Sequence, residues 1–101
     1  MSWLEIIKVQ TAGSQAASAC RDYLAQIGPP QEAQGSTEIL QYHNATIDGC
    51  FMLALRWTTG RIPAQGSGLA HSIIRELKRF GLVDHSVWSG PKSVQGLAGE
   101  P

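Results

Sequence analysis

The segment TEILQYHNATIDGCFMLALRW, from Thr37 to Trp57, contains the side chains of this chain best suited to chemistry. Gln41, His43 and Arg56 lie there among small and apolar residues. An imidazole titrates near neutral pH and can act as a general acid or base, and a guanidinium binds a carboxylate, phenolate or enolate oxygen. His43 and Arg56 are therefore the predicted catalytic residues.

Whether these side chains meet depends on a turn. Asp48-Gly49, between two apolar segments, is the strongest signal for a two-residue hairpin turn of type I′. Counting outward from that turn pairs His43 with Ala54 and Gln41 with Arg56 on one face. The predicted ligand-binding residues on this face are Gln41, Met52, Ala54 and His85, with Lys8 as a further polar neighbour.

The other face of the hairpin is predicted to contact the core. It would carry Leu40, Tyr42, Asn44, Thr46, Phe51, Leu53, Leu55 and Trp57. A competing interpretation of the polar face is that Gln41 and Arg56 form an ordinary cross-strand pair. His43 would then be a hydrogen-bonded interface residue, and His85 a surface residue.

A second candidate site precedes a predicted helix. Gly66-Ser67-Gly68 lies where free N–H groups attract anions, and Arg61 is close in sequence. The competing interpretation is a flexible connection in which Ser67 caps the helix. The lysine and glycine spacing of a P-loop is absent.

The elements that must position these residues follow from hydrophobic periodicity. We expect a strand over 3–10, a helix after a Ser14 cap over 14–27, the hairpin over 37–57, a helix over 67–80 and a strand over 82–88. This order predicts an α+β ferredoxin-like βαββαβ sandwich, with a four-stranded antiparallel sheet and both helices on one face. Residues 1–90 would form one domain, and 91–101 a flexible tail.

Composition limits the possible partners. The 101 residues carry eight basic and eight acidic side chains, so no strong positive field favours nucleic acid. Arg75, Lys78 and Arg79 are expected on a solvated helix face. No signal peptide and no membrane-spanning segment is predicted, which indicates a soluble cytoplasmic protein.

The cysteines and tryptophans have simple expected roles. Cys20 and Cys50 lack metal or redox spacing and are predicted to be small buried hydrophobes. Trp3, Trp57 and Trp88 are predicted core or interface anchors. The sequence indicates no metal site and identifies no cofactor.

The element order, the long central hairpin and the closing segment GLVDHSVWSG resemble the dimeric α+β barrel superfamily that includes antibiotic-biosynthesis-monooxygenase-like proteins, over about residues 1–90. The resemblance implies a homodimer formed through the open sheet faces, with a small-molecule site and cofactor-independent monooxygenase-like activity. It also implies that a partner subunit would meet Ile39, Ala45, Ile47, Met52 and Ala54. A non-catalytic module in which this face only dimerises is the alternative.

Members of that superfamily that act on aromatic substrates or haem use an Asn, a Trp and a His. This chain has Asn44, Trp57 and His71, but the predicted register places the first two toward the helices and His71 on a solvated helix face. The resemblance therefore transfers no catalytic triad to these positions.

Overall fold

The computed structural model describes residues 2–28, 36–58 and 61–91, and within them the chain folds in the order β-α-β-β-α-β. The predicted tail at 91–101 lies almost wholly outside the described residues. The elements are β1 (Trp3–Thr11), α1 (Ser14–Ala25), β2 (Ser36–His43), β3 (Cys50–Trp57), α2 (Gly68–Leu77) and β4 (Gly81–Ser89).

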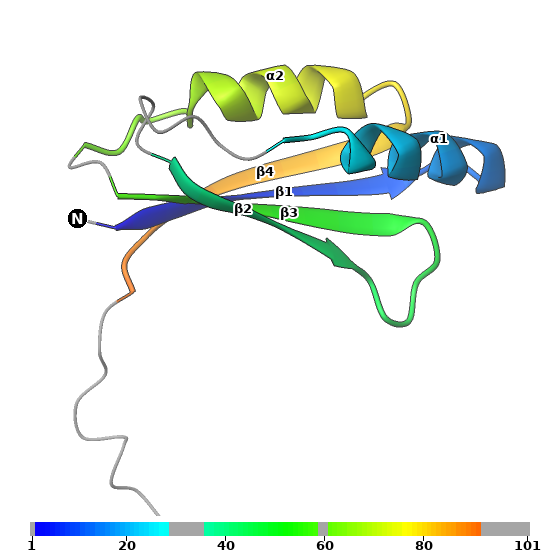
Figure 1. Ribbon diagram of the computed structural model, residues 1–101, viewed down its shortest axis with the longest axis horizontal. Helices are drawn as coiled ribbons and strands as arrows, with labels where there is room; N and C mark the ends of the chain where they lie inside the picture. The colour runs from blue at the N-terminus through cyan, green and yellow to red at the C-terminus, as the bar shows by residue number, and fades with distance from the viewer. Residues whose placement is uncertain (1, 29–35, 59–60, 92–101) are drawn as a thin grey trace, which may run out of the picture.

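The four strands form one antiparallel sheet in the order β2-β3-β1-β4. Both helices lie on the same side of it, and the other side is open (Figure 1). The predicted ferredoxin-like α+β architecture is thus confirmed.

Strict alternation in β1 explains why the sheet has two different faces. Trp3, Ile7 and Val9 point to the helix side and are at most 3% exposed, whereas Lys8 and Gln10 are exposed on the open side. In β3 the same alternation buries Phe51 and Leu53 under the helices. The side chains of a strand point alternately to its two faces, and the faces predicted for β3 are confirmed.

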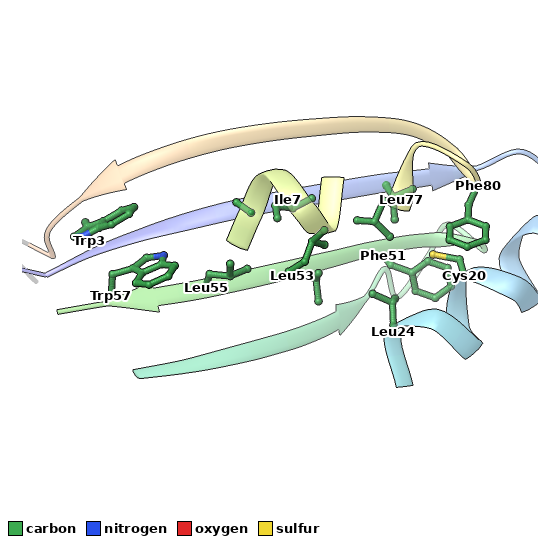
Figure 2. Packing of buried hydrophobic residues seen from close by; sticks show 13 residues of the cluster. Trp3, Ile7, Cys20, Leu24, Phe51, Leu53, Leu55, Trp57, Leu77 and Phe80 are labelled. Carbon is green, nitrogen blue, oxygen red and sulfur yellow. The ribbon is translucent and has the colours of Figure 1, made fainter. Parts of the chain in front are cut away.

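The core runs along the helix side of the sheet (Figure 2). One end of the cluster is formed by Trp3 and Trp57, and the other by Leu24, Phe51 and Phe80. The two helices cover this cluster with the apolar faces predicted for them, and their buried residues are Ala17, Cys20 and Leu24 in α1 and Ala70, Ile73 and Leu77 in α2.

The predicted hairpin register is wrong. His43 was expected opposite Ala54 but lies opposite Phe51, a shift of three positions along β3. A shift by an odd number of residues exchanges the faces of a strand. Gln41 and His43 therefore lie on the helix side, whereas Leu40 and Tyr42 lie on the open side opposite Ala54 and Met52.

The cause is the conformation of the turn. A type I′ turn needs positive φ at both central residues, and in the described chain no residue other than glycine has positive φ. Of the two central residues, Asp48 and Gly49, only Gly49 has a positive φ, of 77°. The strands instead end at His43 and restart at Cys50, with a longer loop between them.

Asn44 and Thr11 hold this loop in place. The Asn44 side-chain oxygen accepts from the backbone N–H groups of Thr46 (2.9 Å) and Ile47 (2.8 Å), as Asn does in turns. The Thr11 hydroxyl donates to the Gly49 carbonyl at 2.8 Å, and a Cβ on Gly49 would lie 2.5 Å from that hydroxyl. Gly49 is thus needed for its approach to β1 as well as for its φ.

Candidate functional site

The structure does not bring the predicted catalytic pair together. His43 lies on the helix side of the sheet, with its ring 5.6 Å from that of Phe51. Arg56 lies on the open side and forms an exposed ion pair with Glu38. The predicted placement of Gln41 and His43 beside Arg56 is therefore wrong, because the register on which it depended is shifted.

The other predicted ligand residues separate in the same way. Met52 and Ala54 lie on the open face as expected, and Lys8 lies beside Met52. His85 lies opposite Ile7 and therefore on the helix side. Its side chain is 17% exposed, so it is not the surface residue of the competing interpretation.

His85 belongs to a cluster around Glu5 that the sequence analysis missed. Glu5 is fully buried, and its two oxygens accept four hydrogen bonds. Oε1 accepts from the Trp57 indole N–H (2.8 Å) and the Ser67 hydroxyl (2.5 Å), and Oε2 accepts from the Ser67 backbone N–H (3.0 Å) and His85 Nε2 (2.9 Å). Burying a carboxylate is costly unless it is paired and hydrogen-bonded, and these four donors meet that requirement.

A glycine makes room for the cluster. Gly66 has φ of 88°, and a Cβ there would lie 2.5 Å from Glu5 Oε2 and collide with the His85 ring. The next residue, Ser67, caps α2 by accepting from the Ala70 N–H at 3.0 Å, as one interpretation of the GSG segment predicted. The carboxylate is therefore bound directly to the start of α2.

The order of the groups excludes a serine-hydrolase triad. In such a triad the imidazole lies between the hydroxyl and the carboxylate. Here the Glu5 carboxylate lies between the Ser67 hydroxyl and His85. The hydroxyl therefore has a carboxylate, not an imidazole, as its immediate proton acceptor.

A cleft opens beside this cluster at the tryptophan end of the core. It has a volume of about 580 Å³ and is lined by Trp3, Trp57, Arg61, Pro63, Ser67, Gly68, Leu69 and Ser72. We call it the Trp cleft. The rings of Trp3 and Trp57 stack on each other with centroids 5.3 Å apart and planes 13° from parallel, so they form one aromatic stack that borders the cleft.

Two polar residues that line the Trp cleft, Arg61 and Ser67, differ in the charge that they bring to it. Arg61 is exposed at its rim and, within the described residues, makes no ion pair. Ser67 reaches the cleft and is hydrogen-bonded to Glu5, so it connects the cleft to the buried carboxylate. Arg61 and the GSG segment thus border one cavity, as the anion-site interpretation required.

The three residues that match the residue types used in that superfamily, Asn44, Trp57 and His71, do not lie together. Trp57 contacts Glu5, and the His71 ring lies 5.8 Å from the His85 ring. Asn44 lies beside Cys50, at the opposite end of β3 from Trp57. No Asn-Trp-His triad forms at these positions.

The alternation in WLEIIKVQ offered a signal for Glu5. Trp3, Glu5, Ile7 and Val9 occupy every second position, and the other three are apolar core residues. A charged residue in the inward-facing row of a strand is a candidate for a buried functional or structural group. The partners of Glu5, from Ser67 to His85, are far away in sequence and leave no such local signal.

The cysteines play no part in the Trp cleft. Cys20 is buried, and this desolvation raises the pKa of its thiol, an effect that the nearby Arg21 charge partly offsets. Burial also raises the pKa of Tyr23, with Glu76 and Cys20 as further causes. Both groups stay protonated at neutral pH, which agrees with core roles.

The described residues hold neither a candidate metal site nor a membrane-spanning helix. No group of three or more His, Cys, Asp or Glu side chains in that part of the chain is arranged to hold a metal ion. No helix there is long and apolar enough to cross a membrane.

The fold and the aromatic cleft define an α+β protein of the ferredoxin-like class, and two solved structures share its architecture. One is described as a "putative antibiotic biosynthesis monooxygenase" from Deinococcus radiodurans, with a TM-score of 0.59, 14% identity and coverage of 94% of this chain and 97% of that chain. The other is a mutant of SnoaB, a cofactor-independent oxygenase from Streptomyces nogalater, with a TM-score of 0.53, 14% identity and coverage of 93% and 97%.

These similarities confirm, at the level of the fold, the resemblance to antibiotic-biosynthesis-monooxygenase-like proteins. No protein-family model matches the sequence, and no curated protein matches it in a sequence comparison.

Proposed function

We propose that this chain binds a planar, hydroxylated aromatic molecule in the Trp cleft and oxidises it with O₂ without a cofactor. The observation that carries the proposal is a cavity bordered by the stacked rings of Trp3 and Trp57, beside a proton-accepting group. Aromatic rings gain stabilisation from offset or edge-to-face contacts with such a stack. The cavity volume of about 580 Å³ lies within the usual range of small-molecule sites.

Ser67 supplies the proton path in this proposal. Its hydroxyl donates to Glu5 Oε1 at 2.5 Å and accepts from the Ala70 N–H, which leaves one lone pair for a substrate O–H or acidic C–H. The substrate proton would pass to Ser67 as the serine proton passes to Glu5. The Arg61 guanidinium would stabilise the resulting phenolate or enolate.

The oxidation balances without an outside reductant. The substrate anion transfers electrons directly to O₂, and an activated CH₂ group becomes C=O. One oxygen atom enters the carbonyl group, and the other leaves as water with the two hydrogens of the CH₂ group. The SnoaB neighbour, described as a cofactor-independent oxygenase, supports this class of reaction.

Oxygen uptake with dithranol, a dihydroxylated anthrone, tests the proposal. We expect the protein to accelerate uptake over buffer and Ser67→Ala to slow it by about 10²-fold, the scale of a lost proton-transfer group. Arg61→Gln should also slow it, whereas Arg75→Gln, an exposed arginine on α2, should not. Absence of both dithranol binding and oxygen uptake would overturn the proposal.

The alternative is a non-catalytic binding or interaction module. The observation in its favour is that Glu5 is fully buried and already accepts four hydrogen bonds, as a purely structural carboxylate would. Quenching of tryptophan fluorescence by dithranol without any oxygen uptake would support this alternative.

We also infer that two chains associate through the open sheet face. Large apolar side chains there are strongly exposed in a single chain, Tyr42 by 48%, Leu82 by 81% and Trp88 by 58%. Leu4, Ile6, Leu40, Met52 and Ala54 extend this surface across the sheet. Large apolar side chains exposed together on one sheet face are typical of an interface, and Lys8, Asp84 and Arg56 lie among them here. In the corrected register Leu40 and Tyr42 take the place predicted for Ile39, while Ala45 and Ile47 lie in the hairpin loop.

A further inference from the structure

A second pocket lies at the opposite end of the core from the Trp cleft. It has a volume of about 300 Å³, between α1 and the β2–β3 edge of the sheet, and its lining includes Arg21, Leu24, Ala25, Gln41, His43 and Phe51. Figure 2 shows Leu24 and Phe51 at one end of the core and Trp57 at the other. Phe51 and Trp57 are six residues apart in β3, which corresponds to about 20 Å in a strand. The two pockets are therefore separate.

The floor of the second pocket is apolar, and its walls carry nitrogen donors. Leu24 and Phe51 are each 5% exposed. The Arg21 guanidinium carbon lies 5.4 Å from the centre of the Phe51 ring, and the His43 ring lies 5.6 Å from it at a tilt of 34°. A guanidinium and an imidazole thus border one aromatic surface.

Neither the Arg21 guanidinium nor the His43 imidazole forms a strong hydrogen bond or ion pair within the described residues. Arg21 lies 3.6 Å from the Asp48 carboxylate, but these side chains are 50% and 91% exposed, and such exposed pairs contribute little. The ring nitrogens of His43 have no hydrogen-bond partner among the described residues, where its ring contacts Phe51. The pocket therefore presents two nitrogen donors to which an added anion could bind.

The backbone around the pocket is fixed by Gln41. Its side-chain N–H donates to the Leu24 carbonyl at 2.9 Å, which ties β2 to the last turn of α1. This hydrogen bond sets the spacing between the two walls before any ligand arrives. A preformed site loses less entropy on binding than one that must be ordered.

We propose that this pocket binds a small carboxylate with a flat apolar body, such as an aromatic acid. The carboxylate pairs with the Arg21 guanidinium in two parallel hydrogen bonds and accepts a third from His43. The apolar body covers Phe51 and Leu24. A volume of about 300 Å³ is at the lower end for ligand sites, so the acid is of one or two rings. The pocket lies on the helix side, so a dimer formed through the open face leaves it accessible.

Titration of the full chain with naphthoate, followed by amide NMR shifts, tests this second site. We expect saturable shifts at residues 21–25 and 41–43, with a Kd on the order of 0.1–1 mM from the size of the ligand. The neutral isostere naphthamide should bind about tenfold more weakly because it cannot form the charged pair. Arg21→Gln should weaken naphthoate by a similar factor, and Arg75→Gln should leave it unchanged.

The Trp cleft provides the decisive control. Arg61→Gln should leave naphthoate binding intact; if it weakens binding and Arg21→Gln does not, the acid occupies the Trp cleft and the second site is overturned. Equal binding of naphthamide, or no shifts at millimolar naphthoate, overturns it as well. His43→Phe keeps a ring against Phe51 but removes the donor, so a well-folded variant that binds naphthoate more weakly supports the assignment.

Discussion

Glu5 is the side chain on which the tryptophan end of the molecule depends. Its oxygens join an indole from β3, the N-cap residue Ser67 of α2 and an imidazole from β4. No apolar residue can make these contacts, and a side chain at position 66 would collide with Glu5 and His85. The wall of the Trp cleft is therefore held in place by a charge rather than by packing alone.

Glu5→Gln tests this role at the residue scale. The amide has nearly the same shape, but its NH₂ group would face two of the four donors, which would then lose their acceptor. Loss of one partner from a buried charged network costs about 2–4 kcal/mol of unfolding free energy. Urea denaturation followed by circular dichroism measures this cost.

Glu38→Gln is the matched control. Glu38 is also ion-paired, to Arg56, but on the exposed face of the sheet. Exposed pairs contribute about 1 kcal/mol or less, so this variant should unfold close to the wild-type midpoint. Equal losses in the two variants would contradict a special role for the buried carboxylate.

At the scale of elements, the two helices begin differently. Ser67 caps α2 through its side chain, whereas α1 begins after Gly13 with no side-chain cap, contrary to the predicted Ser14 cap. The difference has a tertiary cause, because the Ser67 hydroxyl is also a donor to Glu5. The start of α2 is thus fixed by the sheet as well as by its own sequence.

Ser67→Ala should therefore cost more than a cap alone. The lost cap contributes about 1 kcal/mol and the lost hydrogen bond to a carboxylate about 1–2 kcal/mol. Ser14→Ala removes the same group from a similar place on α1 and should change the unfolding free energy by about 0.5 kcal/mol or less. Thermal and urea unfolding of the two variants would show the difference, and equal losses would contradict it.

Sequence alone could predict the elements but not how the hairpin pairs. In β3, the residues predicted to face the core, Phe51, Leu53, Leu55 and Trp57, occupy every second position and are buried, so its two faces were predicted correctly. In β2, Ile39 and Leu40 are adjacent and both apolar, so the strand fits the sheet with either face inward. The register then depended on the Asp48-Gly49 turn, whose real conformation depends on Thr11 in another strand.

The candidate site was harder to predict than the fold for the same reason. Its parts come from both ends of the chain, and Glu5 and His85 are 80 residues apart. Alternation indicates that Glu5 points inward, but only the strand order places β4 beside β1. Long-range pairing therefore determined both the hairpin error and the missed cluster.

At the scale of the whole molecule, the two faces of the sheet have different proposed roles, ligand binding on one and association on the other. Its helix side holds the core, the Trp cleft and the second pocket, and its open side carries exposed apolar residues. Association through the open side would leave both pockets free. It would also remove from water the large side chains that a single chain leaves exposed.

Sedimentation tests this division. We expect wild-type protein to be dimeric at roughly 10 µM, a concentration at which subunit affinity controls the fraction assembled. Met52→Lys places a second ammonium group beside Lys8 near the centre of the open face, and should give a folded monomer because desolvating two like charges opposes association. Trp88→Glu should weaken the dimer from the edge strand, and Arg75→Glu on the outer face of α2 should not. A wild-type monomer, or dimers that persist in both open-face variants, would show that this surface is not the interface.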